Sequence, residues 1–366
     1  MENWENKIVK LTDVCILEKG TQIDTSLLDS SKKYRYINGG IKESGLYDQY
    51  NTSGETVLIS EGGASCGYIN YVNENFWCGC HCYRLHDIKV FPKYLFYALK
   101  GNQDKIMALR TGSAMPNIQK STLQKFELTI HTELQTQKHI ACVLDKASSI
   151  IEKNKTLLAK YDLLIKSVFV QMFGDLSTNS KNWEIKNFTD CAFIDTKMIK
   201  DFKGYEDFPH IGIDSIEKES GILSGYRTIK EDNVISGKYL FTPEHIIYSK
   251  IRPNLNKVAM PNFNGLCSAD AYPILVKKDV ATREYLTYVM RSDFFVSYIL
   301  TLSRRANMPK VNRIQVESFN LPVPPLSLQN DFASFVEKVE QSKQKASLSL
   351  QKAQTLYKSL MQQYFG

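Results

Sequence analysis

Apolar residues recur at heptad spacing in two long stretches of the chain. The first stretch, residues 133–173, contains neither proline nor glycine. Its two series are Ile140, Ala147, Asn154, Tyr161 and Val168, and Leu144, Ile151, Leu158, Ile165 and Met172. Near the C-terminus the pattern returns as Phe332, Val339, Ala346, Ala353 and Leu360, and as Val336, Lys343, Leu350, Tyr357 and Tyr364. Because apolar spacing of ~3.5 residues over several heptads is typical of coiled coils, we predict two long helices that pack on each other.

Two positions of these series are polar, Asn154 and Lys343. Their side chains either reach solvent at a loosely packed point, or fix the register and orientation of the helices as buried polar seam residues do. The pattern alone leaves both interpretations open.

The segments outside the heptad stretches have a different texture. Short β-branched runs such as 56–60 and 245–248 are joined by turns such as Asn38-Gly39-Gly40 and Asn264-Gly265, which predicts strands. Short helices are expected near 92–100 and 283–291. The predicted fold class is therefore α+β. It has two mixed domains, at 1–132 and 178–325, separated by two long coiled-coil helices at 133–177 and 326–366.

The two halves of the chain repeat each other. The matches, in order, are Asn3-Trp4 with Asn182-Trp183, Lys42–Gly45 with Lys218–Gly221, Ala114–Ile118 with Asn307–Val311, and Lys166–Gly174 with Lys358–Gly366. A repeat this long exceeds the periods of solenoid proteins and indicates a duplicated domain. Two divergent copies of one module suggest two similar but unequal targets.

Composition narrows the class of protein without identifying a function. The chain has 366 residues, enough for two or three domains. No window approaches the ~18 continuous apolar residues of a membrane span, and the first residues do not resemble a signal peptide. The eight cysteines show no regular disulfide spacing, so we expect a cytoplasmic protein. The net charge of +7 is compatible with a polyanionic partner but is weak evidence for one.

Several motifs resemble one known family over essentially the whole chain. Residues Lys166–Asp175 read Lys-Ser-x-Phe-x-x-Met-Phe-Gly-Asp, the ending of a helix in specificity subunits of Type I restriction–modification systems. The runs at Gly39–Gly45 and Gly63–Gly67 are similar to one class of target recognition domain in that family. The runs at Ser249–Asn254 and Gly265–Ser268 resemble another class.

This resemblance implies a function and a set of partners. Each target recognition domain would read one half of a split site in double-stranded DNA. The two helices would form an antiparallel spacer and dock two DNA methyltransferase (modification) subunits, to which restriction subunits can be added. The specificity subunit itself would have no catalytic site and no cofactor. Because the two halves resemble different classes, the half-sites should differ in sequence.

The residues support a binding protein rather than an enzyme. Neither Asn38-Gly39-Gly40 nor Glu61-Gly62-Gly63 has the spacing of a nucleotide-binding glycine loop, and Pro322–Pro325 lacks the aromatic residue of a methyltransferase motif. No G-x-x-x-x-G-K-[ST] loop is present. We therefore assign no catalytic residue. The alternatives are a self-contained DNA methyltransferase or nuclease, and a coiled-coil scaffold that binds only proteins.

One cluster of thiols invites a metal, at Cys78, Cys80 and Cys82 beside His81. The spacing is not that of a C-x-x-C zinc knuckle. On a strand the three cysteines would point to one face, and cysteine is among the most buried residue types. We therefore favour core packing over metal binding and assign no metal ligand.

Candidate DNA contacts are basic and amide residues in loops at equivalent positions of the repeat. Arginine suits guanine edges, whereas asparagine and glutamine suit adenine. Any single one can instead be a solvated surface residue. The candidates are Ser65, Arg110, Thr111, Ser113, Asn117, Gln119 and Lys120 in the first half, and Ser249, Lys250, Arg252, Asn254, Lys257, Arg304, Arg305, Asn307, Lys310, Asn312 and Arg313 in the second.

The ends of the two helices carry more apolar residues than a coiled-coil seam requires, since a seam uses two positions per heptad. These residues either belong to the seam or form a docking surface for a partner, and the excess of aromatic residues favours docking. They are Phe169, Met172 and Phe173, and Leu360, Met361 and Phe365.

Overall fold

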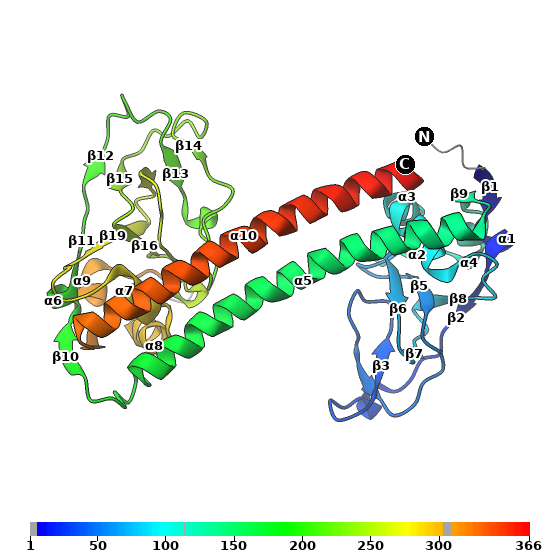
Figure 1. Cartoon of the computed structure of the whole chain (residues 1–366), viewed down its shortest axis with the longest axis horizontal. Helices are drawn as coiled ribbons and strands as arrows, with labels where there is room; N and C mark the ends of the chain where they lie inside the picture. Colours follow the sequence, from blue (N-terminus) through cyan, green and yellow to red (C-terminus); the bar gives the residue numbers. More distant parts are fainter. Residues whose placement is uncertain (1–5, 113, 303–308) are drawn as a thin grey trace. The chain divides into compact units, whose positions relative to one another are not determined.

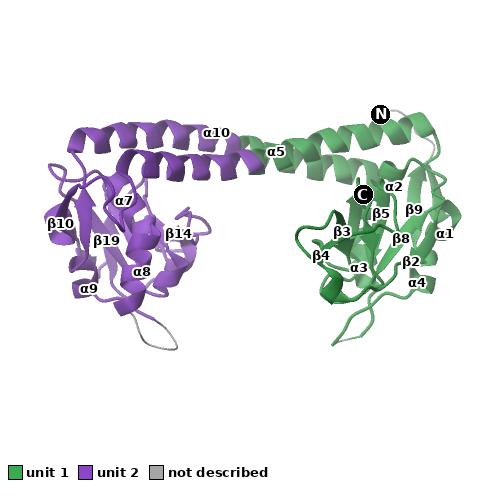
Figure 2. Ribbon diagram, turned by 90° about the horizontal axis from the view of Figure 1, so that it is seen from below, with its two compact units in different colours: residues 1–155, 348–366 green, residues 156–347 purple. Residues whose placement is uncertain are grey.

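A computed structural model describes residues 6–112, 114–302 and 309–366 (Figure 1). The chain divides into two compact units, coloured separately in Figure 2. Unit 1 comprises residues 1–155 and 348–366, and unit 2 comprises residues 156–347. None of the helices in the described part of the chain is both long and apolar enough to cross a membrane.

The described residues of unit 1 form three small sheets, with strand orders β1-β9, β2-β8-β5-β6 and β4-β3-β7. Its strands are β1 (Asn6–Lys10), β2 (Ile16–Lys19), β3 (Tyr34–Ile37), β4 (Gly45–Tyr47), β5 (Thr56–Ser60), β6 (Ile69–Val72), β7 (Trp77–Cys78), β8 (Cys82–His86) and β9 (Glu127–His131). Its short helices are α1 (Leu11–Val14), α2 (Pro92–Gly101), α3 (Gln103–Ala108) and α4 (Lys120–Gln124), with a 3-10 turn at Thr25–Leu27.

The described residues of unit 2 are organised similarly, with strand orders β10-β20, β11-β19-β16-β17 and β12-β15-β18-β13-β14, so that the last sheet has two strands more than its counterpart in unit 1. The strands are β10 (Glu184–Asn187), β11 (Ala192–Ile194), β12 (Met198–Ile199), β13 (Pro209–Ile211), β14 (Arg227–Thr228), β15 (Lys238–Phe241), β16 (His245–Ser249), β17 (Val258–Ala259), β18 (Gly265–Cys267), β19 (Ala271–Val276) and β20 (Asn320–Val323). The short helices are α6 (Phe188–Cys191), α7 (Arg283–Arg291), α8 (Asp293–Leu302) and α9 (Arg313–Glu317), with 3-10 turns at Ile213–Ser215 and Pro253–Leu255.

The two units repeat each other in backbone hydrogen bonding, which supports the predicted duplication. Strand β3 pairs in parallel with β7, and β13 pairs in parallel with β18. After each pair the chain turns in the same way. The N–H of Gly79 donates to the carbonyl of Ile37 at 2.8 Å, and the N–H of Ser268 donates to the carbonyl of Ile211 at 2.9 Å.

One of the sequence matches does not mark equivalent positions. Gly45 opens β4, which pairs with β3. The partner of β13 is instead Arg227–Thr228, and Gly221 lies earlier, in a hairpin closed by the bridge between Ile216 and Leu223. Unit 2 therefore holds extra residues before β14, and the match of Lys42–Gly45 with Lys218–Gly221 is a misalignment.

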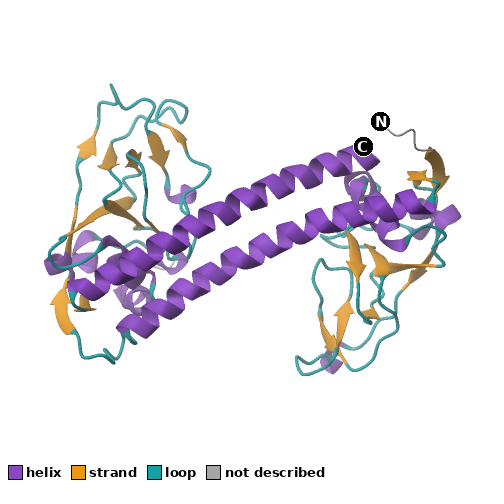
Figure 3. Ribbon diagram, viewed as in Figure 1, coloured by secondary structure: helices purple, strands orange, loops and turns teal. Residues whose placement is uncertain are grey.

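Two long helices, α5 (Leu134–Phe173) and α10 (Leu326–Phe365), pack against each other (Figure 3). Moving along α5, Asn154 contacts Ser349, Asp162 contacts Lys343 and Phe169 contacts Phe332. Partner numbers fall as those of α5 rise, so the helices are antiparallel, as predicted. Many heptad positions are buried, among them Ile140, Leu144, Ala147, Ile165, Phe332, Val336, Val339, Ala346 and Ala353.

The two polar seam residues hydrogen-bond across the helix pair. The Nζ of Lys343 lies 2.8 Å from both Asp162 Oδ1 and Glu340 Oε1, and its side chain is only 13% exposed. Burial lowers the pKa of Lys343, but the two carboxylates outweigh burial and hold that pKa above its usual value. The Nδ2 of Asn154 lies 3.2 Å from Ser349 Oγ. These contacts favour a role in register over a loosely packed point.

The predicted strand through the three cysteines is only partly correct. Cys78 ends β7 and Cys82 begins β8, and both side chains are buried. Residues 79–81 form a turn instead of a strand, so Cys80 is only partly buried and its Sγ donates to Gln22 Oε1 at 3.0 Å. Core packing thus applies to two of the three thiols. No group of three or more potential metal ligands is found among the described residues.

The predicted docking surface at the helix ends is wrong for its central residues. Phe173 is 1% exposed, and its ring contacts Tyr285 of α7 at 4.8 Å between ring centroids and Phe332 at 5.3 Å. Phe169 is buried in the same cluster, with Met172 packed against it. At the end of α10, Phe365 contacts Tyr94 of α2, and Leu360 and Met361 pack against the core of unit 1. The excess aromatic residues attach each helix end to a domain of the same chain.

Candidate nucleic-acid interface

In unit 1, two distant loops are held together where β5 ends. The loop Glu61–Gly67 follows β5, and residues 110–119 meet it through a bridge between Gly62 and Asn117. The N–H of Gly63 donates to the carbonyl of Pro116 at 2.9 Å. Gly63 has φ of +75°, and a Cβ added there would meet no atom within 4 Å. This loop is therefore open to the surroundings and requires glycine.

The structure brings most of the first-half candidates to this loop pair. Thr111 and Asn117 exchange two backbone hydrogen bonds of 2.9 Å, so they close the second loop. The exposed residues are Arg110, Thr111, Asn117, Gln119 and Lys120, whereas Ser65 is partly buried in the first loop. Ser113 lies outside the described residues. The arrangement concentrates amide, hydroxyl and basic side chains on one edge of the domain.

Unit 2 builds the same loop pair from different residues. A bridge joins Ile251 to Lys310, and the N–H of Arg252 donates to the carbonyl of Pro309 at 2.8 Å. Arg252 therefore stands where unit 1 has Gly63. It is exposed and has φ of 51°, a conformation that residues other than glycine seldom adopt. Such outliers gather at functional sites.

The remaining second-half candidates divide into available and occupied side chains. Asn254 is exposed, and Lys310 is exposed with its Nζ 3.0 Å from Asp270 Oδ1. Arg304, Arg305 and Asn307 lie outside the described residues. Besides Lys310, four side chains already have partners within the domain. They are Ser249, bonded to the carbonyl of Ile251, Lys257, bonded to that of Ile213, Asn312, which caps α9, and Arg313, paired with Glu317.

Ser249 is the candidate that the structure contradicts most clearly. It is 2% exposed, because it is the last residue of β16 and its hydroxyl turns inward. The hydroxyl therefore stabilises the turn that presents Lys250 and Arg252. The side chain of Asn312 is also occupied, because its Oδ1 accepts a hydrogen bond of 2.9 Å from the N–H of Gln315 and so caps the start of α9.

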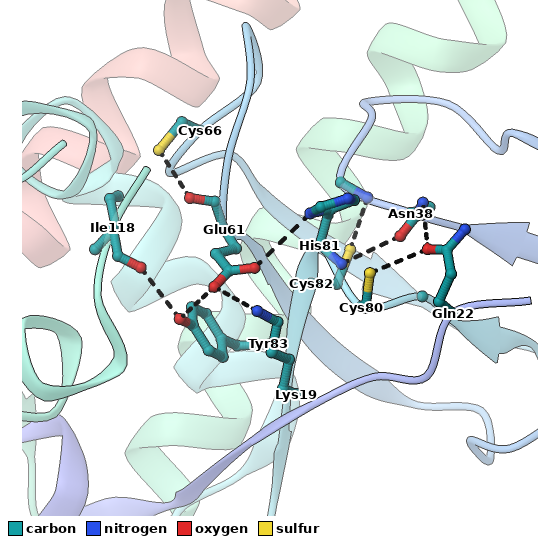
Figure 4. Close-up of polar contacts among 12 residues, drawn as sticks. Lys19, Gln22, Asn38, Glu61, Cys66, Cys80, His81, Cys82, Tyr83 and Ile118 are labelled. Carbon is teal, nitrogen blue, oxygen red and sulfur yellow. Dashed lines mark hydrogen bonds and ion pairs between the residues drawn. The ribbon is translucent and has the colours of Figure 1, made fainter. Parts of the chain in front are cut away.

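Sequence reasoning missed a polar cluster beneath the unit 1 loops (Figure 4). Glu61 Oε1 accepts hydrogen bonds from Lys19 Nζ at 2.8 Å and from the hydroxyl of Tyr83 at 3.0 Å, while Glu61 Oε2 lies 3.9 Å from His81 Nδ1. Burial, and then the hydrogen bond to Glu61, raise the pKa of Tyr83, so its phenol stays protonated and donates. The signal in the sequence is the acidic residue that precedes Gly62-Gly63.

The long helices also expose apolar residues that the seam does not use. Val170 is 58% exposed and Leu163 is 65% exposed, both on the part of α5 in unit 2. Further exposed side chains are Ile150, Leu157 and Leu164 on α5, and Leu348 and Leu356 on α10. These side chains could contact a partner protein, whereas the apolar residues at the helix ends are packed against their own domains.

A family model for the Type I restriction modification DNA specificity domain matches this chain twice, at residues 1–160 and 180–350. The chain is similar to the specificity subunit of the Type I restriction enzyme EcoDI of Escherichia coli, with 27% identity across 91% of this chain and 81% of that protein. A protein of Mycoplasma genitalium named as a type I specificity subunit is 34% identical over 170 residues, which is 43% of each chain.

The fold also matches a solved structure. The S subunit of a Type I restriction–modification system from M. genitalium superposes with a TM-score of 0.74, at 20% sequence identity, over 100% of this chain and 97% of that one. This likeness supports the predicted architecture of two homologous α+β domains and two long helices.

Proposed function

Because the chain belongs to the family of Type I restriction–modification DNA specificity subunits, we propose that it recognises a split, asymmetric DNA site and brings DNA methyltransferase subunits to that site. Subunits of this family are DNA-recognition proteins and not enzymes. The chain would therefore choose the site, and methyl transfer would be carried out by its partners in the cytoplasm.

One observation carries the proposal for a split site. Two homologous domains present the same loop pair, held by the same backbone hydrogen bonds, but with unlike side chains. A shared backbone gives both domains one way of approaching DNA, whereas different side chains select different base edges. We assign residues 1–132 and 178–325 to the two target recognition domains, and 133–177 and 326–366 to the spacer helices.

We further propose that two modification subunits contact the exposed apolar faces of α5 and α10, and that restriction subunits join through them. The support is chemical. Leu163 and Val170 expose apolar surface, and removing apolar surface from water is favourable by ~25 cal/mol per Å² before the entropic costs of association. The buried helix ends, by contrast, are already occupied by their own domains.

Arg252→Ala is expected to weaken recognition of one half-site only. Arg252 is exposed in the unit 2 loop. If its guanidinium reads a base, its loss should cost ~1–3 kcal/mol of discrimination at one position. If it binds a phosphate, binding should weaken for all sequences, and the slope of the logarithm of the binding constant against the logarithm of salt concentration should decrease by about one. The measurement is binding of the assembled complex to DNA with one half-site scrambled at a time.

Lys181→Ala is the matched control, since it removes the same charge from an exposed position just beyond α5. Equal weakening in the Arg252 variant and this control would show only a general effect of charge. Absence of any salt-dependent DNA binding by the wild-type complex would favour a protein-only scaffold, and methyl transfer by the purified chain alone would favour a self-contained methyltransferase.

A further inference from the structure

Glu61 and Lys250 occupy the same position in the two domains. Each is the first residue after the central strand, β5 in unit 1 and β16 in unit 2. The carbonyl of Glu61 accepts from the N–H of Ile118 at 2.8 Å, and the carbonyl of Lys250 accepts from the N–H of Val311 at 2.9 Å. Equivalent positions in the two domains, beneath the paired loops, therefore carry side chains of opposite charge.

Glu61 is held in place but keeps one oxygen available. The residue is 9% exposed, and both of its hydrogen bonds, from Lys19 and Tyr83, go to Oε1. Oε2 lies 3.9 Å from His81 Nδ1, which is beyond hydrogen-bond range. The adjoining Gly63 faces open space. The carboxylate is thus held by Lys19 and Tyr83 (Figure 4), next to an open loop, and neither of these two hydrogen bonds uses Oε2.

Lys250 is equally enclosed, at 9% exposed. Its Nζ lies 4.6 Å from the ring centroid of Tyr272, which stands at the strand position of Tyr83. The nearby carboxylate of Asp270 is already bound by Lys310 at 3.0 Å. Burial, and then the Lys310 ammonium, lower the pKa of Lys250. A hydrogen-bond acceptor that enters the loop would therefore stabilise the charged form of Lys250.

The chemistry of DNA limits what a carboxylate can bind. Phosphates repel it, so Glu61 would bind base amino groups. In the major groove, where all four base pairs can be distinguished, these are N4 of cytosine and N6 of adenine. Lysine has the opposite requirement, because its three hydrogens need acceptors such as O6 and N7 of guanine.

We propose that Glu61 and Lys250 are specificity-determining residues: Glu61 accepts a hydrogen bond from an adenine or cytosine amino group in the first half-site, and Lys250 donates to a base acceptor at the corresponding place in the second. This inference rests on the proposed function and assigns a reading position within it. Lys19 and Tyr83 are positioning residues, since both donate to Glu61 Oε1 and leave Oε2 for the base.

The test is Glu61→Gln, which keeps the side-chain size but replaces one carboxylate oxygen with an NH₂ donor. The complex with its modification subunits is offered DNA in which the first half-site is randomised and the second is intact. We expect preference at one adenine or cytosine of the first half-site to fall by about ten- to one-hundred-fold. Preferences in the second half-site should stay unchanged. Glu127→Gln, at an exposed position of β9, is the matched control.

Other results would overturn the inference. Uniform weakening for every first half-site sequence, or unchanged base preference in a folded Glu61→Gln protein, would make Glu61 a structural residue. Tyr83→Phe should lower affinity while keeping the identity of the preferred base, and a new preferred base would contradict the assignment of roles.

The second domain gives an independent arm if the unit 1 variant fails to fold. Lys250→Gln should lose preference at one base pair of the second half-site, and a loss equal for all sequences would indicate a phosphate contact and overturn the Lys250 role. These outcomes are separate from failure of the proposed function, which would appear as absence of split-site selection by the wild-type complex.

Discussion

One heptad added to each long helix is expected to move the two half-sites apart by about three base pairs. The insertions follow Asn154 on α5 and Leu348 on α10, so that the contact between Asn154 and Ser349 is kept and the apolar seam stays in phase. Seven residues at ~1.5 Å each lengthen the helices by about 10 Å. Since DNA rises ~3.4 Å per base pair, the gap in the recognised site should grow accordingly, which a map of methylated sites measures.

The half-site sequences should not change, because the recognition loops are untouched. Some affinity is lost because the added base pairs rotate one half-site by less than a third of the ~10.5 base-pair turn. Seven residues inserted after the exposed Gly204 serve as the control and should leave the gap unchanged. An unaltered gap between intact half-sites in the helix variant would show that the two helices do not set the spacing.

Phe173→Ala is expected to destabilise the chain by ~3–5 kcal/mol, the usual cost of removing a buried phenylalanine. The ring is enclosed by Phe169, Tyr285 and Phe332, so its loss leaves a cavity and releases the end of α5 from α7. Urea unfolding, followed through the transition of unit 2, measures the effect.

Val170→Ala, on the exposed face of the same helix turn, is the control and should change stability by less than about 0.5 kcal/mol. If Phe173→Ala left stability intact but abolished binding of the modification subunit, the sequence-based assignment of Phe173 to partner docking would be right after all.

The contrast between these two residues shows how far sequence patterns reach. The heptad spacing predicted both helices and their packing on each other, because periodicity depends only on which residues share a helix face. Their antiparallel direction was predicted only by the family resemblance. Periodicity does not say what covers that face. Phe173 is not required for the coiled-coil seam. The residue that helps to bury it, Tyr285 on α7, is more than a hundred residues away in the chain.

The candidate site shows the same limit at finer scale. Loop composition located the paired loops of both domains, since exposed basic and amide residues gather there. It could not distinguish Arg252, whose side chain is exposed, from Asn312, whose amide caps a helix. Glu61 was missed because its setting depends on β2 and β8 bringing Lys19 and Tyr83 together, a register that the sequence did not reveal.

The most direct test of the central claim is a methylation map of DNA from cells that express this chain with a modification subunit of its system. Two homologous domains with unlike loops should yield one bipartite motif whose half-sites differ in sequence and are separated by a fixed, non-specific gap. Exchange of residues 178–325 for the corresponding domain of a relative should replace one half-site and leave the other. A continuous or symmetric motif, or a map that is the same without this chain, would contradict the account.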